Sequence, residues 1–328
     1  MIPHIVTRDF TKDDWWVARE KIKARIFETF GKPPVPLSPE KGEFCELERY
    51  TEYGLVHIKI KYRVFEDEWS YAIIILPNDI EKQGKARAVL TSHGTNGTVG
   101  KYGVCDEAGT PRRAYATELA RRGFVTISPD QYGFGEAMEC EEEKRRFEAF
   151  YDRYPNWSLS SRRVLGHIRA LDVLDALDYV RHDGYGVIGN SLGGQASFYL
   201  AALDERIKAA VISTGISPNV TNVYRDLTRT QALEAGVTRY IKENGKTPWE
   251  LNEMLSLCAP RAVLCLEPFN DPYNPYTSVT VDCIQSAAEA YALLDAPEKL
   301  TLYLHGDGHD TVDSVRRLAY EWLERFLA

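Results

Sequence analysis

The sequence predicts an α/β fold in which a mostly parallel sheet is covered by helices on both faces. Residues 56–64 alternate apolar and charged side chains, the pattern of a half-buried strand, and residues 71–76 form a second, more apolar strand. The short segment 65–68 joins them as a hairpin. Short apolar runs followed by loops and amphipathic helices then repeat to the end of the chain. Antiparallel strands followed by βα repeats are typical of such a sheet, whose active site lies beyond the carboxyl ends of the parallel strands.

The length and charge of the chain limit the kinds of protein and partner that the sequence can represent. Its 328 residues are enough for one large α/β domain, and its hydrophobic content of 44% is that of a globular protein. The formal net charge of −8 argues against a nucleic-acid partner, because phosphate binding needs clustered Lys and Arg. No segment has the apolar length needed to span a bilayer. We therefore expect a small-molecule ligand and neither a nucleic-acid nor a membrane partner, and the sequence leaves a homo-oligomer open.

Targeting and cofactor signals are absent from the sequence pattern. Residues 1–10 lack a basic start followed by an apolar core, so no secretory signal is visible and a cytoplasmic location is expected. The six cysteines are widely scattered, with neither a C-x-x-C pair nor a histidine at metal-ligand spacing. We expect reduced thiols and no metal, nucleotide or flavin cofactor.

The helices and strands follow from the period of the apolar residues. A first helix at 13–30 ends at a Gly-Lys-Pro-Pro sequence, and we assign residues 1–40 to an N-terminal helical extension of a domain at 41–328. Six strands follow the hairpin and bring the total to eight, at 88–91, 124–128, 185–188, 209–213, 262–266 and 300–304. The helices predicted around them lie at 112–121, 160–180, 192–203, 278–293 and 311–327.

Two connections are longer than a βα unit requires. The first, at 131–159, is rich in acidic and aromatic residues and fits either a lid or a solvated acidic helix. The second, at 216–258, contains helical patterns at 224–233 and 248–255 and fits a small cap or a subunit contact. Long loops at the catalytic edge of a sheet usually serve function, so we expect both insertions near the active site.

The segment 189–194, Gly-Asn-Ser-Leu-Gly-Gly, joins the strand at 185–188 to the following helix. A serine at such a strand-to-helix turn, flanked by glycines two residues away, is typical of a nucleophile elbow. Gly189 and Gly193 leave room for the tight turn because they lack a Cβ. The pattern predicts that Ser191 is a catalytic nucleophile. The alternative is a glycine-rich turn that carries an incidental serine.

A serine hydroxyl needs a general base, which in turn needs an acceptor to orient it. The segment 305–310, His-Gly-Asp-Gly-His-Asp, follows the last strand, where a side chain can reach over the elbow. His309 is our candidate base, because the glycines around Asp307 give its loop the freedom to do so. His305, at the end of the strand, is the competitor.

The acid is expected at the end of the preceding strand, 262–266. Asp271 is our candidate, in the loop between that strand and the next helix, and Glu267 is the runner-up because it lies closer to the strand. Asp271 could instead be only a turn residue before Pro272. Its pairing with a histidine at the next strand end favours the catalytic interpretation.

The oxyanion formed when a serine attacks a carbonyl needs two prepared donors. The backbone N–H of Leu192, at the start of the helix, is one. The second is expected from the loop at 92–97, whose glycines let the backbone turn towards the site. We assign it to the backbone N–H of Thr95, with Gly94 as the alternative, and expect His93 to anchor the loop.

Further segments around these residues carry a family pattern; they lie at 92–94, 119–125, 128–135, 189–194, 202–210 and 259–261. Together they resemble the α/β-hydrolase superfamily and, within it, the dienelactone hydrolase-like and acetyl xylan esterase-like branch. The resemblance covers about residues 55–328. It implies a triad of Ser191, Asp271 and His309, an eight-stranded core sheet and ester hydrolysis without a cofactor. It also implies a structural role for Asp130. The serine stands where dienelactone hydrolases use cysteine, which favours an esterase.

The sequence therefore predicts a serine carboxylesterase that cleaves short acyl or acetyl esters, including those of sugars, through an acyl-enzyme. A second hypothesis keeps the triad but places an amide or carbon–carbon bond in a chamber built by the two insertions. A third is a binding protein without chemistry on the same scaffold. A panel of nitrophenyl esters separates the first two hypotheses, and a fluorophosphonate probe separates both from the third.

Overall fold

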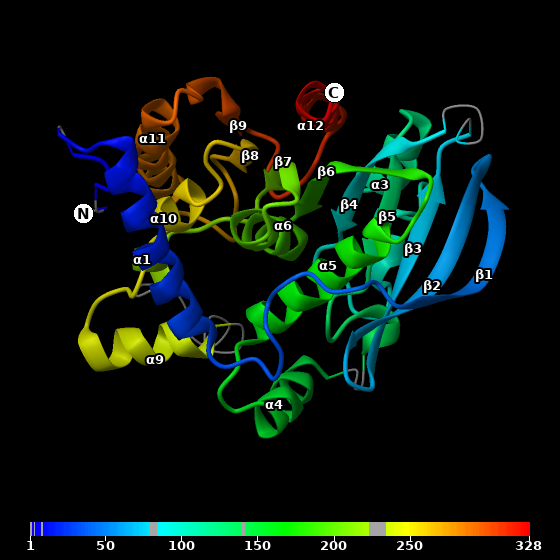
Figure 1. Cartoon of the computed structure of the whole chain (residues 1–328), viewed down its shortest axis with the longest axis horizontal. Helices are drawn as coiled ribbons and strands as arrows, with labels where there is room; N and C mark the ends of the chain where they lie inside the picture. Colours follow the sequence, from blue (N-terminus) through cyan, green and yellow to red (C-terminus); the bar gives the residue numbers. More distant parts are fainter. Residues whose placement is uncertain are drawn as a thin grey trace.

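A nine-stranded sheet runs through the centre of the computed structural model, which describes residues 2, 4–7, 9–78, 80, 84–138, 142–222 and 234–328. The strand order is β1-β2-β3-β5-β4-β6-β7-β8-β9. Strands β1, β2, β3 and β5 pair antiparallel, and β5, β4, β6, β7, β8 and β9 pair parallel (Figure 1). The strands span Phe44–Glu52, Leu55–Phe65, Glu68–Leu76, Ala86–Ser92, Val125–Pro129, Val180–Asn190, Ile207–Ser213, Ala262–Pro268 and Leu300–His305, from β1 to β9.

Strand β1 is the addition to the eight strands predicted from the sequence. It carries charged residues along both faces, is mostly exposed and pairs only with β2 at the edge of the sheet. A strand that buries neither face lacks the apolar alternation by which strands are recognised, so the sequence pattern missed it. The prediction of a helix at 160–180 also needs a correction. Helix α5 ends at Asp175, and Val180, which fits the helical period, instead begins β6 and pairs with Ala86.

Helices cover both faces of the sheet. Helices α5 (Leu159–Asp175), α6 (Leu192–Leu203) and α11 (Thr277–Leu293) pack on one face and share its apolar core. Helices α3 (Tyr115–Arg121) and α12 (Asp313–Phe326) cover the other face. In the described connections, 3-10 helices lie at Gly100–Val104, Gly135–Ala137 and Pro297–Lys299. This layering leaves the loops at the carboxyl ends of the parallel strands uncovered by the core helices, as the active-site prediction requires.

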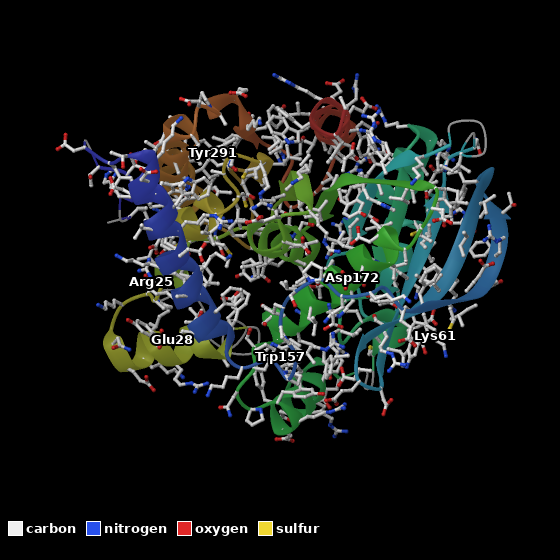
Figure 2. The ribbon with its side chains drawn as sticks, in the orientation of Figure 1. Arg25, Glu28, Lys61, Trp157, Asp172 and Tyr291 are labelled. Atoms are coloured by element: carbon white, nitrogen blue, oxygen red, sulfur yellow. The ribbon has the colours of Figure 1, made fainter. Side chains whose placement is uncertain are left out.

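The N-terminal helix packs against the helices of the second insertion. Helix α1 (Lys12–Phe30) begins with a capping box between Thr11 and Asp14, and it contacts α9 (Ala235–Asn244) and α10 (Leu251–Ser256). Arg25 of α1 forms an ion pair with Glu253 of α10, and Figure 2 shows Arg25 on this side of the molecule. The assignment of residues 1–40 as a separate extension stays a prediction.

The two insertions contain short helices. In the first, α4 (Glu143–Arg153) turns Phe150 into a cluster of aromatic rings with Phe65, Tyr154 and Trp157, the last of which is labelled in Figure 2. The aromatic residues of this insertion therefore form the buried side of α4. The second insertion contains α7 (Asn219–Asn222), α9 and α10. The helix predicted at 224–233 lies outside the described residues. None of the helices in the described ranges has the length and apolarity that a membrane crossing requires.

Candidate active site

The predicted nucleophile lies on a sharp turn between β6 and α6. Strand β6 ends at Asn190, helix α6 begins at Leu192, and Ser191 between them has φ 58° and ψ −124°. A positive φ is rare for a residue with a Cβ and is expected of the nucleophile in such an elbow. A Cβ added to Gly189 would lie 2.3 Å from the Gly193 carbonyl oxygen, and one on Gly193 would lie 2.1 Å from the Ser92 oxygen. Both glycines are therefore required by close backbone approach.

Thr214, at the end of the neighbouring strand β7, supports the elbow from the side. The backbone N–H of Ser191 donates to the Ser213 carbonyl oxygen (2.9 Å) and to Thr214 Oγ1 (3.1 Å). The Asn190 side chain donates to the same hydroxyl at 2.7 Å. Thr214 itself has φ 49°, an outlier for a β-branched residue that indicates backbone strain. Sequence analysis missed this residue, although the parallel pairing of two neighbouring strands would have brought their carboxyl ends together.

The candidate base and acid meet at the ends of the next two strands. His309 Nδ1 lies 2.8 Å from Asp271 Oδ2, in loops that follow β9 and β8. The Asp271 side chain is 1% exposed, and its other oxygen accepts the backbone N–H of Tyr273 at 2.7 Å. Asn270 joins the two loops, because it accepts from the Gly308 N–H and donates to the Gly306 oxygen. With Nδ1 bonded to the carboxylate, Nε2 is the nitrogen left to face a substrate or a serine.

Ser191, Asp271 and His309 line one pocket of about 670 Å3. The two alternatives weighed from the sequence, His305 and Glu267, are buried residues outside the lining of that pocket. Burial lowers the pKa of His305, whose ring pairs with Asp307, and burial raises the pKa of Glu267 well above its usual range. The structure therefore brings together the three residues preferred from the sequence and places the two alternatives behind them.

The loop after β4 lies beside the elbow. Thr95 and Leu192 both line the pocket with Ser191, and a Cβ on Gly94 would lie 3.7 Å from the Ser191 Cβ. His93 fixes this loop: its Nδ1–H donates to the Gly94 oxygen at 2.7 Å, and its Nε2 accepts the Gln131 N–H at 3.0 Å. Burial lowers the pKa of His93 to about 4, so the ring stays neutral and keeps this arrangement.

Asp130 holds two further loops at the same edge of the sheet. Its carboxylate accepts the backbone N–H groups of Lys101 (2.8 Å) and Glu136 (3.0 Å), and the Lys101 ammonium lies 2.7 Å away. Burial raises the pKa of Asp130, and the adjacent Lys101 ammonium opposes that shift. The contacts are all within the protein framework, so Asp130 organises the loops and does not line the pocket.

The pocket extends from the candidate catalytic residues along α6 and into the second insertion. Its lining there includes Gln195, Phe198, Tyr199, Glu234, Trp249 and Leu251. Gln195 and Tyr199 belong to α6, Glu234 directly precedes the first residue of α9, and Trp249 lies two residues before the first residue of α10. Sequence analysis missed these residues because their own residue types form no diagnostic pattern, although Gln195 directly follows the elbow segment 189–194.

Glu234 is the most unusual group in this part of the pocket. It is 4% exposed, and its Oε1 accepts hydrogen bonds from the Tyr199 hydroxyl and from Gln195 Nε2, the latter at 3.3 Å. Burial raises the pKa of Glu234 to about 7, against the opposing hydrogen bond from Tyr199. Both protonation states of Glu234 are therefore populated near neutral pH.

Within the described part of the chain, no three His, Cys, Asp or Glu side chains are grouped in a way that could hold a metal ion. The chemistry that the arrangement can support with its own side chains is nucleophilic attack by a serine, with proton transfer through a histidine oriented by a carboxylate.

Comparisons with known proteins give the same class of enzyme fold. A model of the dienelactone hydrolase family matches residues 102–241, a region that contains Ser191 and ends before Asp271 and His309. The Bacillus subtilis protein "Putative hydrolase YtaP" is 29% identical over 252 residues, which cover 75% of this chain and 80% of the relative. A promiscuous CE15 esterase from a marine bacterial metagenome superposes with a TM-score of 0.77 at 17% identity, over 99% of this chain and 97% of that one. The chain has the α/β-hydrolase fold.

A second solved structure shows the same fold. A glucuronoyl esterase from Solibacter usitatus, at 15% identity, also covers 99% of this chain and 97% of its own length, with a TM-score of 0.72. The resemblance to the α/β-hydrolase superfamily and its dienelactone hydrolase-like branch, predicted from the motifs, is confirmed. In this fold the nucleophile elbow, the acid loop and the histidine loop occur in the chain order Ser, Asp, His. The candidate residues Ser191, Asp271 and His309 follow that order along the chain.

Proposed function

We propose that this protein is a serine hydrolase that cleaves carboxylic esters of small molecules, with Ser191, His309 and Asp271 as its triad. The observation that carries the proposal is the pair of His309 Nδ1 and Asp271 Oδ2, 2.8 Å apart, in the pocket that Ser191 lines from a strained elbow. The match to a hydrolase family and the likeness to esterase structures support the hydrolase class.

The proposed reaction assigns one task to each residue. Ser191 Oγ attacks the ester carbonyl while His309 Nε2 takes its proton, and Asp271 stabilises the imidazolium that results. The backbone N–H groups of Leu192 and Thr95 are assigned to the oxyanion. The imidazolium then returns the proton to the departing alcohol, and water repeats the cycle on the acyl-enzyme. A donor lost from such a hole typically costs about 3 kcal/mol of transition-state stabilisation.

The substrate class proposed is short acyl or acetyl esters, with sugar esters among them. A pocket of about 670 Å3 lies within the range of roughly 300–1,000 Å3 that is usual for small-molecule sites. Its lining is mixed, with carboxyl, amide and hydroxyl groups beside aromatic rings, and so it suits a polar ester better than a long alkyl chain.

The test is covalent labelling with a fluorophosphonate, with the labelled residue located by mass spectrometry. We expect wild-type protein to be labelled at Ser191, and we expect labelling to collapse in His309→Ala and Asp271→Asn. Turnover of nitrophenyl esters of increasing acyl length then shows whether the bond cleaved is a carboxylic ester. Labelled protein that hydrolyses none of them would favour an amide or carbon–carbon substrate, and protein that resists labelling would contradict the catalytic role.

A further inference from the structure

The pocket contains a second polar group of residues at a fixed distance from the nucleophile. Gln195 and Tyr199 follow Ser191 by four and eight residues on α6, so both lie on its face of the helix. At 1.5 Å per residue, they stand about 6 and 12 Å along the axis from Ser191. All three residues line the same pocket. A substrate group of moderate length bound at the serine therefore reaches them.

Glu234 faces these two side chains from another segment of the chain. Its Oε1 accepts from both the Tyr199 hydroxyl and Gln195 Nε2, which occupies the lone pairs of that oxygen. Glu234 also lines the pocket, and none of the described residues bonds its Oε2. This oxygen is not among the buried atoms without a partner, so it is open to the pocket that Glu234 lines. A ligand that covers it must supply a hydrogen-bond donor, because a carboxyl oxygen removed from water without a partner costs free energy.

Aromatic rings pack closely around Tyr199, the hydrogen-bond partner of Glu234. The rings of Phe198 and Trp249 lie 5.6 and 6.4 Å from that of Tyr199, and the Phe30 ring of α1 packs behind it at 5.6 Å. The Trp249 indole N–H donates to Thr29 of α1 at 2.8 Å. Side chains locked by packing in this way are suited to recognise a substrate group at a defined place.

We propose that Gln195, Tyr199 and Glu234 form a polar subsite that binds a hydrogen-bond donor of the substrate, a hydroxyl or an ammonium group, some 6–12 Å from the scissile ester. The proposal rests on the esterase function and names the substrate class for the same pocket. The subsite prefers an ester with a polar terminus over the alkyl ester of equal length, because the alkyl terminus leaves Glu234 Oε2 unpaired.

Two matched series of esters test the subsite from both sides of the scissile bond. The first is hexyl acetate, 6-hydroxyhexyl acetate and 6-ammoniohexyl acetate, and the second is 4-nitrophenyl hexanoate with its 6-hydroxy and 6-ammonio derivatives. The quantity measured is the ratio of kcat/KM between a donor-bearing ester and its alkyl parent. We expect a ratio of about ten or more in one series, as one hydrogen bond to a buried carboxyl provides.

Substitutions of Glu234 separate the two possible occupants. Glu234→Leu is expected to bring the ratio to about one for every donor. Glu234→Gln keeps an acceptor without a charge, so it should retain a preference for the hydroxyl and lose one for the ammonium. The control is Glu243→Gln, which makes the same change on the exposed side of α9, outside the lining of this pocket, and should keep the wild-type ratio.

The ratio of kcat/KM between the donor-bearing and alkyl esters should depend on pH, which a purely structural role of Glu234 would not produce. The ratio for the ammonium ester should rise as the carboxyl ionises, around its pKa of about 7. Among the described residues, the groups that face Glu234 are Tyr199 and Gln195 of α6 and Tyr151 of α4. Because the Tyr199 hydroxyl stabilises the ionised form, Tyr199→Phe should move the midpoint of that rise to higher pH. If Glu234→Leu does not fold, Tyr199→Phe tests the subsite in its place.

The outcomes distinguish the subsite from the proposed function. Hydrolysis of the alkyl esters with ratios of one or less in both series would overturn the subsite alone. A Glu234→Leu variant that keeps the wild-type kcat/KM ratio would also overturn the subsite alone. A protein that turns over no member of either series would overturn the esterase function and the subsite together.

Discussion

The proposed catalytic residues and the proposed polar subsite share one pocket, but the chain brings them together in different ways. Ser191, Asp271 and His309 occupy loops at the carboxyl ends of three parallel strands, and each lies close to a glycine or a turn residue in the sequence. Gln195, Tyr199 and Glu234 are brought together by a helix face and by the start of α9, with α1 packed behind them. The first group depends on strand order, and the second depends on how an insertion and the N-terminal helix pack.

This difference in construction indicates which segments determine the reactivity of the pocket and which determine its choice of substrate. Strand ends place the reactive atoms, because neighbouring parallel strands present their carboxyl ends at one edge. The end of the pocket away from the serine is completed by the second insertion, and insertions are generally tolerated at surface connections. Chemistry and substrate choice should therefore respond separately to substitution.

The largest effect is expected at the nucleophile. Ser191→Ala removes the attacking oxygen, and we expect kcat for nitrophenyl acetate to fall by about 10⁴–10⁶-fold. Ser217→Ala is the matched control, since Ser217 lines the same pocket without a catalytic task, and it should change kcat by less than about tenfold. Activity that persists in Ser191→Ala would move the nucleophile elsewhere in the chain.

The acid is expected to have the next largest effect. Asp271→Asn replaces the carboxylate that accepts from His309 Nδ1, which favours the wrong tautomer of the ring, and kcat should fall by about 10³–10⁴-fold. Asp307→Asn makes the same change beside the other histidine, at a side chain that is 44% exposed, and should have little effect. The reverse result would assign the base to His305.

The protonation of Glu234 should appear in the stability of the whole protein. The carboxyl has a pKa of about 7 when folded, against the ordinary value of 4.5 expected for the unfolded chain, so the folded protein holds the proton more tightly across that range. Stability is therefore lost as pH rises from about 4.5 through 7, by about 3 kcal/mol in the free energy of unfolding. Glu234→Gln should lack this loss, while Glu243→Gln should retain it. Denaturant unfolding at several pH values measures the difference, and parallel curves for wild type and Glu234→Gln would contradict it.

The smallest effect is expected where the N-terminal helix supports the pocket. Thr29→Val removes the acceptor of the buried Trp249 indole N–H, which should lower the free energy of unfolding by about 1–2 kcal/mol. We expect the ratio between donor-bearing and alkyl esters to fall as well, while kcat for nitrophenyl acetate changes little. Lys21→Ala, at an exposed position of the same helix, is the control. A change confined to kcat would mean that α1 acts on the catalytic loops instead.

The parts of the molecule that could be predicted from sequence are those in which one local pattern fixes the backbone. The elbow is such a case, because the glycines at 189 and 193 have no other role than to admit close backbone contacts. The strand order of the α/β-hydrolase fold then predicted which later loops would approach Ser191. His309 and Asp271 do lie together, although they are 38 residues apart in the sequence.

The parts that escaped prediction depend on contacts between segments that carry no local signal. Thr214 becomes important only because β7 lies beside β6, and nothing in Ser-Thr-Gly distinguishes it along the chain. Glu234 is one acidic residue in an insertion, and its altered pKa arises from burial against α6. Strand β1 buries neither face, so its charged sequence resembles a loop.

The hydrogen bond between the backbone of Ser191 and the side chain of Thr214 has a consequence for protein engineering. Both residues have a positive φ, and each lies at the end of a different strand. The smallest portable unit that contains this serine is therefore a pair of adjacent strands with their two turns. A graft that carried only the strand, the Gly-Asn-Ser-Leu-Gly sequence and the helix would leave the donor N–H without its hydroxyl partner, and the recipient scaffold would have to supply that partner from its own neighbouring strand.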